Sequence, residues 1–119
     1  MRLGEINIIC TNGAESLKFY RDILGFQFLE EEEGCYHLEF SGVRFLLLPI
    51  ASAPSRSLPY GSSAAISFDL LVDSIVEVKA IFKQNGVSIL RENSTASKSM
   101  HITDPDGNVI EVIEARATP

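Results

Sequence analysis

A histidine and a glutamate on either side of a predicted turn are the residues of this sequence best suited to chemistry. Residues 104–108 read Asp-Pro-Asp-Gly-Asn, and proline, glycine and short polar side chains favour a tight turn. We expect Thr103 to pair with Val109 across this turn. That register places His101 opposite Glu111, within side-chain reach. A register shifted by one residue would separate the two side chains.

The predicted pair has two possible roles. It could serve as a general base with its orienting carboxylate, or as two ligands of a weak metal site. Glu111 lies in mid-strand and alternates with Val109 and Ile113, and a carboxylate there is costly unless it is paired, metal-bound or facing a water-filled pocket. The alternative is structural, with both side chains simply satisfied by the neighbouring strands.

Other polar residues are weaker candidates. Glu5 lies near the chain terminus, where an exposed strand-end glutamate is the default and a functional carboxylate the alternative. His37 is nominally opposite Leu46 and, without a carboxylate partner, is expected to line a pocket. Asp69 could be a third buried acid or part of a salt bridge with lysine or arginine. The acidic run at 30–33 is expected to be a solvated loop.

The elements that position these residues follow from apolar periodicity and capping signals. Asn12 is typical of a helix N-cap, as is Asp73 or Ser74, and glycine ends both predicted helices. The apolar stripe of the first helix comprises Leu17, Tyr20, Ile23 and Leu24. The predicted helices are 14–24 and 75–84, and the predicted strands are 5–10, 26–31, 36–40, 43–48, 64–72, 87–91, 99–103 and 109–115.

This element order is the same in both halves of the chain, as βαβββ. Such an internal repeat predicts an α+β fold of two modules within one domain, residues 1–119. Module one covers about 1–50 and module two about 64–115, joined by a linker at about 51–63 that is rich in serine, alanine and proline. A polar loop is expected at 92–97.

Composition excludes several classes of partner. The formal net charge of the 119-residue chain is −6, which argues against nucleic acid and anionic membrane. The longest apolar run, 45–50, is too short to span a bilayer. Cys10 and Cys35 lack CxxC spacing and are most simply reduced thiols in a cytoplasmic protein, although two cysteines could also form a bridge.

Two motifs carry a resemblance to a known family. The sequence Ser-Leu-Lys-Phe-Tyr-Arg-Asp-Ile-Leu-Gly-Phe at 16–26 and the sequence Asp-Pro-Asp-Gly-Asn-Val-Ile-Glu at 104–111 resemble the vicinal oxygen chelate superfamily. That superfamily holds glyoxalase I, the bleomycin-resistance proteins, fosfomycin-resistance thiol transferases and the extradiol dioxygenases. The resemblance implies tandem βαβββ modules that form a curled mixed sheet around a cavity, and commonly a homodimer.

The resemblance also indicates where metal ligands would lie. Metal-bearing members place His or Gln, Glu, His and Glu at positions that fall on Glu5, Leu46, Ser67 and Glu111. Leu46 cannot coordinate a metal and Ser67 would do so poorly, so we expect no tight metal. If a divalent metal such as zinc, nickel or manganese binds, Glu5, Glu111 and His101 would hold it.

Two functions from different classes remain. The first is metal-free binding of a small, cationic or partly apolar molecule, like the bleomycin-resistance proteins. The second is a glyoxalase-type lyase or isomerase with an altered, weak divalent-metal site, in which His101 and Glu111 are catalytic. The residues expected on the cavity faces are Glu5, Asn7, Ile9, His37, Leu46, Leu48, Ser67, Asp69, Leu71, His101, Val109, Glu111 and Ile113.

Overall fold

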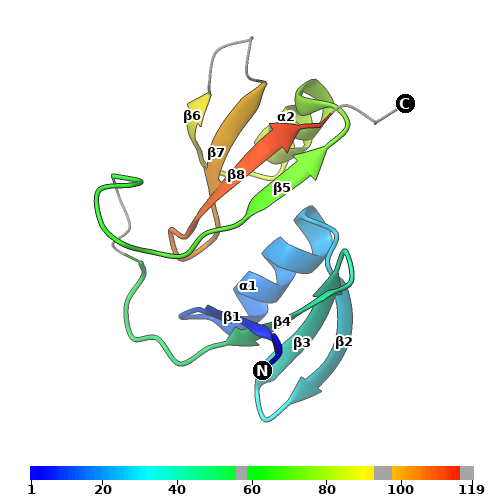
Figure 1. The fold of residues 1–119 in the computed structure, drawn as a ribbon, viewed down its shortest axis with the longest axis vertical. Helices are drawn as coiled ribbons and strands as arrows, with labels where there is room; N and C mark the ends of the chain where they lie inside the picture. Colours follow the sequence, from blue (N-terminus) through cyan, green and yellow to red (C-terminus); the bar gives the residue numbers. More distant parts are fainter. Residues whose placement is uncertain (56–58, 93–97, 116–119) are drawn as a thin grey trace. The chain divides into compact units, whose positions relative to one another are not determined.

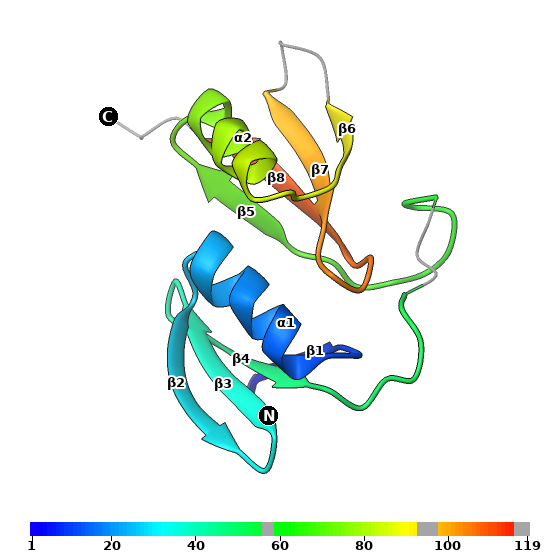
Figure 2. The same ribbon diagram turned by 180° about the vertical axis from the view of Figure 1, so that it is seen from behind.

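Each half of the chain folds into a four-stranded sheet with a helical segment against one face (Figures 1 and 2). The computed structural model describes residues 1–55, 59–92 and 98–115. The chain divides between Pro54 and Ser55 into two compact units, and this boundary falls inside the stretch predicted to be a linker.

The first unit contains the first βαβββ series. Its sheet has the order β1-β4-β3-β2, in which β1 is parallel to β4 and the other neighbours are antiparallel. The elements are β1 (Ile6–Ile9), α1 (Gly13–Leu17), η1 (Lys18–Ile23), β2 (Gln27–Glu32), β3 (Cys35–Phe40) and β4 (Val43–Leu48).

The second unit repeats that topology. Its sheet has the order β5-β8-β7-β6, again with the first strand parallel to the last, so the predicted α+β class and tandem βαβββ repeat are confirmed. Each module forms a sheet of its own. The elements are β5 (Asp69–Val72), α2 (Ile75–Gln84), β6 (Ile89–Glu92), β7 (Ser99–Thr103) and β8 (Val109–Glu114).

Both predicted helix starts are confirmed. The side chain of Asn12 accepts a hydrogen bond from the Glu15 backbone N–H at 3.0 Å. The side chain of Ser74 accepts one from the Glu77 backbone N–H at 3.3 Å, which selects Ser74 over its neighbour as the cap. These bonds satisfy donors that the first helical turn leaves open.

The apolar stripe expected for the first helix is wrong in part. From Lys18 the helix widens into a π-helix, in which the Leu24 N–H bonds to the Phe19 carbonyl five residues back. This wider turn brings both Phe19 and Tyr20 into the core, whereas Leu24 of the predicted stripe is only half-buried. Because the π-turn changes the angular spacing, a strict 3.6-residue period could not identify Phe19.

Alternating burial gives each sheet a core face and an open face. In β1 and the residue after it, Ile8 and Cys10 are buried and Ile9 is exposed. Both cysteines of the chain are reduced. In β8, Ile110 and Val112 are buried next to the half-buried Glu111. The polar candidates therefore lie on the open faces, as the alternation predicts.

The strand predicted at 64–72 is shorter than expected. β5 begins at Asp69, and Ile66, which lies inside the predicted strand, is 99% exposed. Asp69 pairs with Glu111 in parallel register, so a strand beginning at 64 would need partners at 106–108. Those residues form the turn before β8 and make hydrogen bonds within it. Residues 64–66 therefore have no neighbouring strand in the described part of the chain to pair with. Apart from Glu92, which belongs to β6, the predicted polar loop at 92–97 lies outside the described residues.

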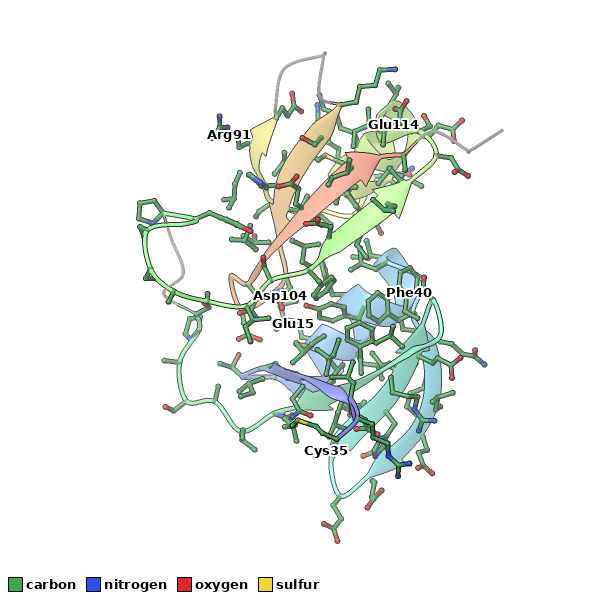
Figure 3. All side chains as sticks on the ribbon, in the orientation of Figure 1. Glu15, Cys35, Phe40, Arg91, Asp104 and Glu114 are labelled. Carbon is green, nitrogen blue, oxygen red and sulfur yellow. The ribbon has the colours of Figure 1, made fainter. Side chains whose placement is uncertain are left out.

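One buried carboxylate holds the turn between β7 and β8. Asp104, labelled in Figure 3, is 4% exposed. Its Oδ1 accepts hydrogen bonds from the backbone N–H groups of Asp106 and Asn108, both at 2.9 Å, and its Oδ2 accepts one from the Asn108 side-chain amide at 2.9 Å. This side-chain network fixes the length of the turn and hence the strand register.

No helix in the described part of the chain is long and apolar enough to cross a membrane.

The turn network makes a prediction about stability. Replacing Asp104 with alanine removes three hydrogen bonds to an ionised acceptor, so we expect the free energy of unfolding to fall by about 2–4 kcal/mol. Urea denaturation followed by circular dichroism measures it. The exposed Pro105 supplies the control, because Pro105→Ala should cost less than about 1 kcal/mol. Equal losses from both substitutions would show that Asp104 does not hold the turn.

Candidate functional site

Each sheet carries a row of four side chains across its open face. Neighbours in a row are direct partners on adjacent strands, so their side chains lie next to one another. The row of the first sheet is Asn7, Leu46, His37 and Glu30, and that of the second is Asp69, Glu111, His101 and Arg91. Both predicted pairings, His101 opposite Glu111 and His37 opposite Leu46, are confirmed.

A β-bulge in each sheet completes these rows. In β2 the register shifts between Phe28 and Glu30, and in β6 it shifts between Ile89 and Arg91. Without the extra residue, a leucine would oppose each histidine instead of a charged side chain. Bulges of this kind redirect side chains, and they are common next to functional sites.

In the second unit, the histidine and glutamate form the predicted contact. His101 Nε2 lies 2.9 Å from Glu111 Oε2, and their side chains are 15% and 30% exposed. An ionised Glu111 can only accept, so the ring donates from Nε2 and, when neutral, carries its lone pair on Nδ1. The pair thus has the orientation of a base held by a carboxylate.

Tyr60 completes this group, and sequence reasoning missed it. Its ring stacks on the His101 ring with centroids 4.9 Å apart and an interplanar angle of 11°. Its hydroxyl lies 2.8 Å from Ser67 Oγ. Tyr60 belongs to the stretch predicted to be a linker, where a single tyrosine among serine, proline and glycine was the only available signal.

Asp69 was predicted to be either a buried acid or part of a salt bridge, and neither prediction is correct. It is exposed rather than buried, and among the described residues it forms no ion pair with lysine or arginine. It lies directly beside Glu111 on the parallel strand, so two carboxylates are adjacent on this face.

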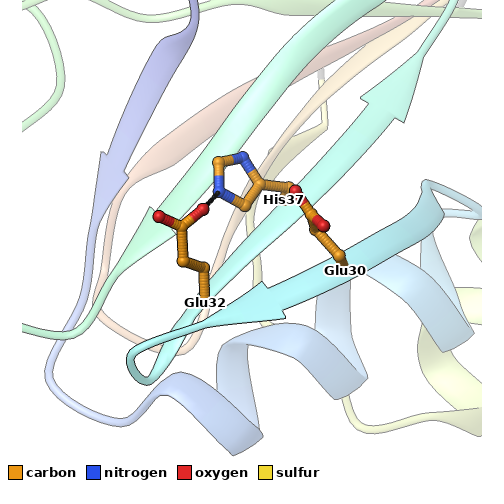
Figure 4. A group of neighbouring side chains, drawn as sticks. All are labelled: Glu30, Glu32 and His37. Atoms are coloured by element: carbon orange, nitrogen blue, oxygen red, sulfur yellow. Dashed lines mark ion pairs between the residues drawn. The ribbon is translucent and has the colours of Figure 1, made fainter.

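In the first unit, His37 does have carboxylate partners, contrary to the sequence prediction. Glu5 Oε1 lies 3.1 Å from Nδ1, and Glu32 Oε2 lies 3.4 Å from Nε2. The loop expected for the acidic run at 30–33 is correct only for Glu33, which lies in the turn after β2. Glu30 and Glu32 belong to β2 and lie beside His37 (Figure 4). The contact with Glu5 joins residues 32 positions apart in sequence, which strand periodicity alone cannot pair.

The residues expected to wall a cavity vary in exposure. Ile9 is 51% exposed and Val109 only 7%. Leu46, Leu48 and Ile113 are half-buried, and Asn7 and Leu71 are exposed. The cavity itself stays a prediction.

The side chains at the metal positions of the family do not fit a tight site. Leu46 has no donor atom, and the neutral hydroxyl of Ser67 is already bonded to Tyr60. Glu5 and Glu111 remain, and each is hydrogen-bonded to a histidine. A transition-metal site usually needs three or more strong donors with imidazole or thiolate among them.

The alternative metal set draws its residues from both units. His101 and Glu111 are in contact in the second unit, whereas Glu5 belongs to the first unit and bonds to His37 there. Within one unit, this set therefore supplies two donor groups.

The fold and the two rows define a protein of paired βαβββ modules with a histidine on each open sheet face. The family model of the Glyoxalase/Bleomycin resistance protein/Dioxygenase superfamily matches residues 2–112, and the chain belongs to this superfamily.

Similar proteins carry several different names. Metallothiol transferase FosB of Staphylococcus haemolyticus is 29% identical over 113 residues, which cover 92% of this chain and 81% of that protein. Catechol-2,3-dioxygenase of Bacillus subtilis is 30% identical over 118 residues, covering 96% of this chain but only 41% of that longer protein.

Solved structures share the fold at lower identity. The fosfomycin resistance protein FosX of Listeria monocytogenes superposes with a TM-score of 0.79 at 15% identity, covering 98% of this chain and 94% of that one. Lactoylglutathione lyase of Agrobacterium tumefaciens gives a TM-score of 0.69 at 21% identity, covering 96% and 93%.

The orientation of the two histidines can be tested directly. In alkaline buffer, where imidazoles are neutral, ¹⁵N chemical shifts should show the Nε2–H tautomer for His101 and the Nδ1–H tautomer for His37. Glu111→Gln should shift His101 toward a mixture of tautomers, because an amide can donate as well as accept. His37 is the internal control and should not change. An Nδ1–H tautomer at His101 in the unsubstituted protein would contradict the assigned contact.

Proposed function

We propose that the chain binds a small cationic, partly apolar molecule on the open face of its second sheet. The observation that carries this proposal is the pair of adjacent carboxylates, Asp69 and Glu111. Like charges on neighbouring strands repel. His101 hydrogen-bonds Glu111, but no lysine or arginine in the described residues neutralises Asp69, so a ligand cation would relieve the repulsion.

The surroundings of the two carboxylates suit such a ligand. Tyr60 provides an aromatic ring that is 40% exposed, and Leu71, two residues beyond Asp69 in β5, is 69% exposed. Aromatic faces attract cations, and apolar side chains favour the uncharged part of the ligand. The net charge of −6 favours cations generally.

We also propose that the protein is a homodimer in a reducing, cytoplasmic environment. The resemblance to the superfamily supports the dimer, and Ile9 and Leu71, exposed on the open sheet faces, are apolar side chains that a partner could cover. Two reduced cysteines fit a reducing compartment.

A second candidate function is a lyase or isomerase of the glyoxalase type. The hydrogen bond from His101 to Glu111 favours this function, because it fixes the ring with Nδ1 as the free base. Nδ1 could take a proton from a substrate carbon beside a carbonyl and return it, while Glu111 stabilises the imidazolium. The names of the relatives, a metallothiol transferase and a dioxygenase, also lend support to an enzyme.

Benzyltrimethylammonium is a suitable probe for the binding proposal, with benzyl alcohol as its uncharged counterpart. Isothermal titration should detect the cation and not the alcohol. Asp69→Asn and Glu111→Gln should each weaken binding about tenfold, the equivalent of one lost charge contact. Asp73→Asn, an exposed aspartate just beyond β5, is the matched control and should leave affinity unchanged. Full affinity in both site variants would refute the proposal. Light scattering on the same samples gives the mass that tests the dimer.

Metal titration separates the two candidate functions. For the binding function, zinc, nickel and manganese should show no uptake that depends on Glu111. Stoichiometric metal in protein purified without chelator, lost in Glu111→Ala but kept in Glu31→Ala, would overturn metal-free binding at this face. The lyase proposal with an altered metal site fails if Glu111→Ala changes no uptake.

A further inference from the structure

A second group of donor atoms lies on the first sheet, and nothing in the proposed function uses it. Glu30, Glu32 and His37 each offer one donor atom, and these atoms all lie within 4.8 Å of one another (Figure 4). We propose that this group binds a divalent transition-metal ion, with Glu5 as the residue that positions His37. This site lies away from the positions that the family resemblance assigns to metal ligands, apart from Glu5.

The spacing of the donors fits coordination better than direct hydrogen bonding. His37 Nε2 and Glu32 Oε2 are 3.4 Å apart, longer than the roughly 2.9 Å of a typical N–H···O bond. Zinc binds nitrogen and carboxylate oxygen at about 2.0–2.2 Å, and the tetrahedral angle then separates two donors by roughly 3.3–3.6 Å. An ion between these two atoms would therefore require little rearrangement.

The histidine is oriented as a metal ligand usually is. Its Nδ1 is hydrogen-bonded to Glu5 at 3.1 Å, which leaves the Nε2 lone pair of the neutral ring on the side of Glu32. Ligating histidines almost always donate their second N–H to a carboxylate, carbonyl or water, which fixes the tautomer and raises ligand basicity. The His37 side chain is only 15% exposed, so its direction is well constrained.

The negative charges of the glutamates around His37 favour a bound cation. In the part of the chain that the structure describes, no lysine or arginine pairs with Glu5, Glu30 or Glu32. In the second sheet, by contrast, the acidic residue Glu92 has a cationic partner. Lys79 pairs with it and lowers the pKa of its carboxyl. Beside His37, a bound cation would offset the converging negative charge.

The bulge in β2 is the backbone feature that creates the group. It turns Glu30 toward His37 and leaves Glu32 on the same face two residues later. One imidazole and two carboxylates with open positions for water suit zinc or manganese, because imidazole favours the former and carboxylate the latter. Zinc is therefore a suitable probe for this site.

The test is a zinc titration of the untagged full chain, followed by calorimetry and by ¹⁵N shifts of the histidines. The chain has two histidines, so His101 serves as an internal reference. We expect one equivalent of zinc to move the His37 Nε2 resonance and leave that of His101 in place. Glu30→Gln and Glu32→Gln should each weaken zinc binding at least tenfold, and Glu5→Gln about tenfold, because it acts through the ring.

Glu31→Gln is the matched control. It removes the same charge from the same strand, but Glu31 lies between the two ligand positions and alternates to the other face, opposite Tyr36. Zinc affinity should be retained in this variant. No uptake would show that the group holds no metal, and equal losses in all three β2 variants would show diffuse attraction to an acidic strand; either result overturns the site. Because these variants leave Glu111 intact, the outcome is independent of the function proposed for the second sheet.

Discussion

The buried carboxylate of Asp104 fixes the geometry on which the second module depends. By accepting hydrogen bonds from Asp106 and Asn108, it sets the length of the turn between β7 and β8. Strand register follows from turn length, and a shift of one residue would send every side chain to the opposite face. The contact between His101 and Glu111, and the burial of the intervening core residues, therefore rest on one aspartate.

Two modules with the same strand order have different electrostatic environments. In each, a bulge places a charged residue beside the histidine of the central row: Glu30 in the first module and Arg91 in the second. Glu5 and Glu32 surround the first histidine with further negative charge. The second has one carboxylate and an aromatic ring instead. A repeated fold thus supports two chemically distinct surfaces, which is why fold alone does not define function.

At two of the family's metal positions this chain has no suitable donor atom, but it keeps many acidic side chains. Leu46 and Ser67 lack suitable donor atoms, yet carboxylates gather beside both histidines. Surplus negative charge at defined positions therefore favours the binding of cationic ligands and ions. The same physics links both proposals: adjacent carboxylates on a sheet are unfavourable until a cation neutralises them.

Features that depend on residues close together in the chain could be predicted from the sequence. Periodicity, caps and turn residues gave the βαβββ repeat, the helix starts at Asn12 and Ser74, and the pairing of His101 with Glu111 across a short turn. Contacts between residues far apart in the chain, such as Glu5 with His37 and Tyr60 with His101, became visible only in the folded structure. The bulges and the π-turn also escaped prediction. They depend on how strands and helix pack together, and local preferences of the chain do not specify that packing.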